Sequence, residues 1–145
     1  MKENELLETE FGKYAILNYE EQNSEYNGMI IESSSNVKVR CRKAKKTPKK
    51  EGYFVAFWEK DKQSKNQPFD FENSPEILAI SVVDGDQVGV FVFPKQICVD
   101  KGIYSTKRKT GKMAMRFYPT WCLNLNATAV RTQKWQLDYF KDYSE

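Results

Sequence analysis

The amino-acid sequence predicts an α+β fold, in which a mostly antiparallel central sheet of about five or six strands is flanked by helices at the N and C termini. Three observations support this prediction. The middle of the chain holds several apolar segments of strand length, Gly and Pro residues punctuate them, and both ends carry apolar residues among polar ones without either breaker. With 145 residues, of which 40% are hydrophobic and 30% charged, the chain has the size and composition of one globular domain.

The N-terminal part predicts one helix and the beginning of the sheet. Residues 2–9 (KENELLET) predict a short acidic helix. Residues 11–21 fit either a helix or a mixed segment, because their apolar side chains could lie along one helical stripe or fill a strand. Residues 29–31 (MII) begin a strand that ends before the SSSN loop.

A change of period marks the segment that starts at residue 37. Apolar and basic side chains alternate there, which is typical of a strand with two unlike faces. The apolar face holds Val37, Val39 and Cys41, and the basic face holds Lys38, Arg40 and Arg42. Thr47-Pro48 ends this strand, because Pro has no amide donor. The run YFVAFW (53–58) is typical of a buried, central strand.

A hairpin is expected after the polar loop at residues 59–67. Its strands are residues 76–83 (EILAISVV) and residues 87–93 (QVGVFVF). Asp84-Gly85-Asp86 between them has the composition of a tight hairpin turn. The sequence therefore predicts antiparallel neighbours here.

The last third predicts two further strands and one long helix. Residues 97–99 form a short strand, and residues 113–119 (MAMRFYP) form an alternating strand after a basic loop. Residues 126–143 contain neither Gly nor Pro and predict a single terminal helix.

Charge is sorted along the chain into blocks of one sign. Residues 33–50 carry eight basic residues and no acidic one, and residues 91–136 carry nine basic residues and one acidic one. Residues 1–32 carry eight acidic residues and two basic ones. Like charges repel each other, so a fold that keeps the two basic blocks together is expected to offer them to an anionic partner.

Several chemistries are excluded or disfavoured by residue content. The chain has no His, so neither a Ser-His-Asp nor a Cys-His nucleophile system can be built. Its three Cys residues are widely spaced without a CxxC pair, which argues against a disulfide framework and structural zinc. No apolar run is long enough for a signal peptide or a membrane span. We therefore expect a reduced, soluble, cytoplasmic protein that has no membrane partner and needs no cofactor.

Five fragments in a specific order resemble the MepB family of small bacterial proteins. They are AKKTPKKEGYFVAFW (44–58), VFPK (92–95), GK (111–112), MRFYPTW (115–121) and TQKWQLDYF (132–140). The resemblance covers about residues 37–140, and we take the chain 1–145 as one MepB-like domain. It implies a compact α+β protein whose fold is suggestive of nucleic-acid-handling domains, the restriction-endonuclease-like type among them. It implies no particular reaction, since fold does not fix function.

The two basic blocks and the aromatic residues beside them predict binding of nucleic acid or of nucleosides and nucleotides, without catalysis. Lys and Arg would meet phosphates, aromatic rings would stack on bases, and Gln amides could pair with base edges. Residues 38–50 would form one wall of a basic groove, and the segment from Lys112 to the TQKWQ helix the other. The residues expected to contact the ligand are Arg40, Arg42, Lys45, Lys46, Thr47, Lys49, Lys50, Lys95, Lys112, Arg116, Tyr118, Trp121, Gln133, Lys134 and Trp135.

Blander and sharper alternatives stay open at this point. The basic residues could simply keep the protein soluble, and Tyr118 and Trp121 could belong to the core. A third class, a protein that docks on an acidic partner, would use the same charges.

A Mg²⁺-dependent nuclease would need carboxylates and a Lys at the ends of adjacent strands. The candidates for that role are Asp70, Glu72, Asp84, Asp86 and Lys95, with Glu20 or Glu21 from the N-terminal segment. However, Phe93 stands where the acidic residue before Lys95 would be expected. We therefore assign no catalytic or metal-binding residue.

Overall fold

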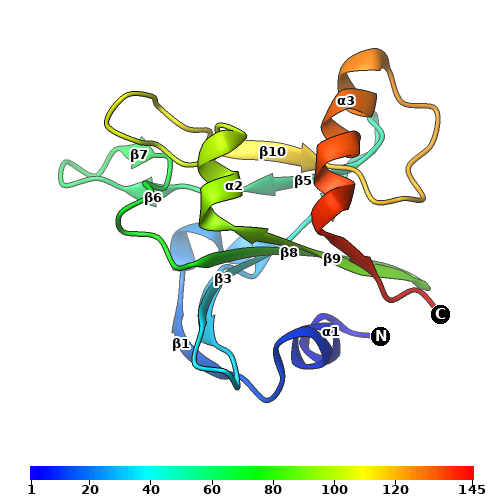
Figure 1. Ribbon diagram of the computed structural model, residues 1–145, viewed down its shortest axis with the longest axis horizontal. Helices are drawn as coiled ribbons and strands as arrows, with labels where there is room; N and C mark the ends of the chain where they lie inside the picture. Colours follow the sequence, from blue (N-terminus) through cyan, green and yellow to red (C-terminus); the bar gives the residue numbers. More distant parts are fainter.

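A computed structural model describes residues 1–145, and its centre is a six-stranded sheet with the order β1-β2-β3-β8-β9-β11 (Figure 1). The strands are β1 (Ala15–Tyr19), β2 (Met29–Glu32), β3 (Lys38–Lys43), β8 (Ile77–Asp84), β9 (Gln87–Pro94) and β11 (Phe140–Asp142). Only β3 and β8 run parallel, and the other neighbours are antiparallel. The predicted α+β class and mostly antiparallel sheet are confirmed. The restriction-endonuclease-like relationship stays a prediction.

One face of this sheet is covered by helix α1 (Glu3–Phe11), which lies below the sheet in Figure 1. Leu6 and Leu7 of the helix are buried against a cluster that includes Val39 and Cys41 of β3. The predicted N-terminal helix and the apolar face of β3 are therefore confirmed.

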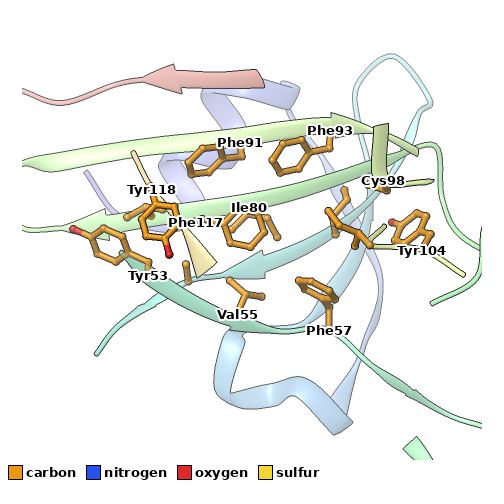
Figure 2. Close-up of a cluster of buried hydrophobic side chains, with 14 of the residues drawn as sticks. Tyr53, Val55, Phe57, Ile80, Phe91, Phe93, Cys98, Tyr104, Phe117 and Tyr118 are labelled. Carbon is orange, nitrogen blue, oxygen red and sulfur yellow. The ribbon is translucent and has the colours of Figure 1, made fainter. Parts of the chain in front are cut away.

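The opposite face carries a second layer, made of a three-stranded sheet and two helices. The small sheet has the order β10-β5-β4, with β10 (Ala114–Phe117), β5 (Tyr53–Ala56) and β4 (Lys45–Lys46), and the helices are α2 (Lys95–Asp100) and α3 (Ala127–Gln136). Figure 2 shows aromatic rings from both layers meeting, among them Phe91 and Phe93 of β9 and Phe117 of β10. The run YFVAFW is central, as expected, but in the small sheet.

Three short elements complete the chain between these layers. A 3-10 helix, η1 (Glu21–Tyr26), follows β1, and a second one, η2 (Leu137–Tyr139), follows α3. The segment predicted as a polar loop at 59–67 contains a small hairpin of β6 (Glu59–Lys60) and β7 (Asn66–Gln67).

Two predicted elements near the N terminus and the centre are wrong in type. Residues 11–21 contain the edge strand β1 and the start of η1, because pairing with β2 decides between patterns that the sequence leaves open. Residues 97–99 lie in helix α2, where Cys98 faces the core, since a short apolar run does not distinguish strand from helix.

The predicted long terminal helix ends at Gln136. The chain then joins the main sheet as β11, and Phe140 packs on Phe91 at 4.6 Å between ring centroids. Gly89 of β9 makes room for this contact, because a Cβ there would lie 2.2 Å from Phe140. Burial of Phe140 against the core outweighs continuation of the helix.

None of the helices has the length and apolar character that crossing a membrane requires.

Candidate functional site

The two arginines expected on an exposed basic strand face are buried. Arg40 is 4% and Arg42 0% exposed, because β3 is an interior strand whose second face is covered by the other layer. Glu20 neutralises both: its Oε1 accepts from Arg42 Nη1 at 2.8 Å and from Arg40 Nε at 3.1 Å. The alternation along β3 was predicted correctly, but the exposure of its basic face was not.

Further contacts fix these guanidinium groups in place. Asn23 Oδ1 accepts from Arg42 Nε and Nη2, and Arg40 stacks on the Phe69 ring at 3.6 Å from its centroid. Burial lowers the pKa of the Arg42 guanidinium, while the Glu20 carboxylate opposes this shift. Arg40 and Arg42 hold η1 and the loop at Phe69 onto the sheet, so they are not offered to a ligand.

The outer surface of the small sheet carries a row of cations and aromatic rings. Cross-strand register places Arg116 of β10 opposite Phe54 of β5, and Phe54 opposite Lys45 of β4. Arg116 Cζ lies 5.9 Å from the Phe54 ring centroid, and Lys45 Nζ lies 5.2 Å from that of Tyr26 in η1. The rings of Tyr26 and Phe54 are 6.2 Å apart. We call these four residues the cation–aromatic row.

Side chains that are next to Phe54 in sequence point the other way. Tyr53 and Val55 are buried against the main sheet, whereas Phe54 and Ala56 are partly exposed. Figure 2 shows Tyr53, Val55 and Phe57 on the core side of β5. The single alternation in YFVAFW therefore builds the core and leaves one aromatic ring on the surface.

The turn after β4 joins the two basic segments of the sequence. Arg116 Nη2 donates to Thr47 Oγ1 at 2.7 Å, and Arg116 Nη1 donates to the Glu51 carbonyl at 3.2 Å. Lys49 and Lys50 are exposed on this turn. The expectation that residues 38–50 and Arg116 lie side by side is confirmed for the part of the first segment that follows β3.

Lys46 faces away from Lys45, toward a pocket of 360 Å³ beside the turn. Its Nζ lies 3.5 Å from Asp84 Oδ2, which also accepts from the Tyr53 hydroxyl at 2.7 Å. The Trp121 indole donates to the same hydroxyl at 2.8 Å. Burial, followed by the bond to Asp84, raises the pKa of the Tyr53 phenol, so it stays a neutral donor. Trp121 lines this pocket with its N–H already bonded.

A second pocket of 370 Å³ lies on the other side of the same turn. Lys50, Arg116 and Tyr118 line it together with the loop before α3. Tyr118 is 9% exposed and its ring lies against Gly52, where a Cβ would approach to 2.5 Å. The turn thus separates two polar pockets that both have Lys50 in their lining.

Most of the predicted site residues on α3 serve the fold. Gln133 Nε2 donates to the carbonyls of Pro119 and Cys122, and Trp135 packs on Phe93 at 5.7 Å between centroids. Lys134 is exposed. The amide of Gln133 and the ring of Trp135 are therefore already engaged, and the expectation that the TQKWQ helix forms a binding wall is not supported by their contacts.

The remaining predicted cations lie elsewhere. Lys95 begins α2, with its Nζ 4.4 Å from the Phe71 ring centroid. Lys112 is exposed just before β10. The neighbouring Lys107 and Arg108 line a separate pocket with Asp70 and other residues. The second basic block is thus divided between two places.

The carboxylates considered for a metal centre do not gather into one. No group of three or more Cys, Asp or Glu residues is arranged to hold a metal ion. Asp84 has the contacts described above, and Asp70 accepts from the backbone and side chain of Asn73.

With this geometry described, comparison with known proteins identifies the family. A model of the MepB-like family matches residues 20–142. The chain belongs to the MepB-like family. A solved protein described as "Crystal Structure of MepB" is 40% identical, with 100% of this chain and 99% of that chain covered and a TM-score of 0.88. A search among curated proteins found no match.

The MepB-like match begins earlier than the resemblance read from residues 37–140. It takes in Glu20 and η1, which hold Arg40 and Arg42 and supply Tyr26. Sequence reasoning missed Tyr26 because only the fold brings η1 to the small sheet. It passed over Phe54 inside the apolar run, although the period of two in that run places Phe54 opposite to Tyr53 and Val55.

Proposed function

We propose that this MepB-like protein binds nucleic acid, or its nucleotides, on the outer surface of the small sheet, in the cytoplasm and without catalysing a reaction. The cation–aromatic row carries the proposal. A partly exposed ring between two cations, on consecutive strands, has the chemistry that a base and its flanking phosphates require.

The row suits a flexible, unpaired strand. Bases stack on aromatic side chains with about 1–3 kcal/mol each, and this contact accepts any base. Lys45 and Arg116 on either side of Phe54 would meet the phosphates, while Lys49 and Lys50 on the adjoining turn extend the positive surface. Thr47 and the Glu51 carbonyl hold the Arg116 guanidinium beside the sheet, which lowers the entropy lost on binding.

Fluorescence anisotropy with a labelled single-stranded oligonucleotide, titrated at several salt concentrations, tests the proposal. The logarithm of the binding constant should fall linearly with the logarithm of the salt concentration, by about 0.7 per phosphate contacted. Lys49→Ala combined with Lys50→Ala should weaken binding several-fold and flatten this slope. Lys13→Ala combined with Lys38→Ala is the charge-matched control, because these exposed lysines lie after α1 and at the start of β3.

The contribution of stacking is tested at Phe54. Phe54→Leu keeps an apolar side chain but removes the ring, so it should weaken binding about fivefold or more while the melting temperature changes little. Binding that ignores salt and both sets of lysines would contradict the proposal, and retention on an acidic protein instead would favour the partner-docking alternative. Incubation with Mg²⁺ should leave the oligonucleotide intact, and cleavage would contradict the absence of catalysis.

A further inference from the structure

The two edges of the main sheet are protected very differently. Edge strand β11 is three residues long and carries Lys141 and Asp142. Edge strand β1 is five residues long, and the segment from Tyr14 to Tyr19 contains no charged residue and no Pro. Charges and Pro on an edge normally prevent pairing with another chain. A bulge between Ile16 and Asn18 is the one such device in β1.

The side chains of β1 are apolar and exposed. Ile16 is 43%, Leu17 46% and Tyr19 61% exposed. The bulge places Ile16 opposite Ile31 and Tyr19 opposite Met29, so both lie on the face of the sheet that α1 covers. However, α1 packs over β8 and β9 and leaves β1 uncovered, as its place in Figure 1 shows.

A groove of 310 Å³ runs between β1 and the beginning of α1. Its lining includes Tyr14, Ile16, Tyr19, Glu3 and Glu21. The carboxylate of Glu3 accepts from Ser81 Oγ at 2.7 Å and from Asn27 Nδ2 at 3.0 Å, but no cation pairs with it. Glu21 is exposed and has no ion pair. The groove therefore combines phenol rings with two negative charges that lack a counter-charge.

Electrostatics indicates what could occupy this groove. Residues 1–32 carry eight acidic side chains and two basic ones, so the region repels phosphate and is separate from the surface proposed for nucleic acid. A second copy of this chain would bring the same glutamates to a β1–β1 contact. Like charges brought together across an interface disfavour that pairing.

We propose that β1 binds an extended, Lys- or Arg-rich peptide segment of another protein. The segment adds a strand to the free edge of β1, and its apolar side chains cover Ile16 and Leu17. One cationic side chain enters the groove, where the rings of Tyr14 and Tyr19 and the charges of Glu3 and Glu21 surround it. Strand addition supplies affinity through backbone hydrogen bonds, and the pocket supplies specificity.

The probe is a labelled synthetic peptide of alternating arginine and valine, titrated with the full chain in an anisotropy assay. Glu21→Lys should weaken binding about fivefold or more, since it replaces an attractive charge with a repulsive one. Tyr19→Ser should weaken it similarly. Asp138→Lys is the matched control, because Asp138 is exposed on η2, outside the groove, and should leave binding unchanged.

Two modified peptides separate strand addition from simple charge attraction. A peptide with N-methylated backbone amides on alternate residues keeps its charge but cannot pair along one edge, and it should lose most of the affinity. A glutamate-for-arginine peptide should not bind. Equal binding of the N-methylated peptide, equal loss with Asp138→Lys, or a dimer of the chain that Tyr19→Ser disperses would overturn the proposal.

Discussion

Glu20 and Arg42 form an ion pair that is almost completely removed from solvent, with 2.8 Å between Oε1 and Nη1 and side-chain exposures of 8% and 0%. The same carboxylate oxygen pairs with Arg40. One buried acid thus holds two buried cations and ties the end of β1 to β3. Removing one partner of a buried pair leaves the other charge without compensation.

Glu20→Gln should therefore lower the free energy of unfolding by about 3–5 kcal/mol. Urea denaturation followed by circular dichroism measures this change. The matched control is Glu21→Gln, because Glu21 is the exposed neighbour and its substitution should change stability by less than about 0.5 kcal/mol. Equal effects of the two substitutions would show that the buried pair does not hold the strands together.

Gly52 is predicted to be the less replaceable of two glycines with positive φ. Its φ is 90°, and a Cβ would lie 2.5 Å from Tyr118, whereas Gly85 has φ 62° and open space around it. Gly85→Ala should cost only the left-handed backbone term of about 1–2 kcal/mol. Gly52→Ala should cost about 1–3 kcal/mol more, because the Tyr118 ring must move. Thermal unfolding of both variants, compared with the parent chain, tests this order.

Gln136 joins helix α3 to strand β10. Its Oε1 accepts from the Tyr118 N–H and its Nε2 donates to the Arg116 carbonyl, both at 2.9 Å. Gln136→Leu leaves both backbone groups without partners, and the expected loss of stability is about 2–4 kcal/mol. Lys134→Ala on the exposed side of α3 is the control and should be nearly neutral. A near-neutral Gln136→Leu variant would contradict this role.

Stability should fall as the solution becomes alkaline, with Cys98 as one cause. Burial raises the pKa of the Cys98 thiol to about 12, against about 8.5 for an unfolded Cys. Between these values the unfolded chain releases a proton that the folded chain keeps, so the free energy of unfolding decreases as pH rises. Below about pH 8 the effect of Cys98 vanishes.

Urea unfolding in the presence of a reductant, at intervals between about pH 8 and 10, should show this decrease. Cys98→Ala should make the decrease shallower by up to about 1.4 kcal/mol per pH unit. Part of the decrease should remain in this variant, because burial also raises the pKa of Cys122, to about 11. An unchanged slope in Cys98→Ala would show that the thiol is not sheltered.

The sequence predicted the fold class because the strongest signals are local. The hairpin from Ile77 to Pro94 and the helix Glu3–Phe11 follow from turn chemistry and apolar periodicity. The helix α2 and the strand β11 were missed because tertiary contacts decide them. Phe140 leaves the helical path for a place on Phe91 that only the folded sheet provides.

The candidate site was predictable in part for the same reason. Thr47 and Arg116 were expected to lie near each other, and they are hydrogen-bonded. Arg40 and Arg42 were placed on the right face of their strand, but the sequence does not say that a second layer covers this face or that Glu20 neutralises them. Charge patterns report composition along a strand, whereas burial depends on elements far away in the chain.

Photocross-linking to a single-stranded oligonucleotide that contains iodouracil, followed by mass spectrometry of the cross-linked peptide, tests the proposed binding surface most directly. This base couples to aromatic side chains that it contacts. Our account predicts cross-links at Phe54 or Tyr26, the two rings of the cation–aromatic row, and their loss in Phe54→Leu at the first position. Cross-links confined to Trp121 or to the groove beside β1, or none at all under conditions where binding is measured, would contradict it.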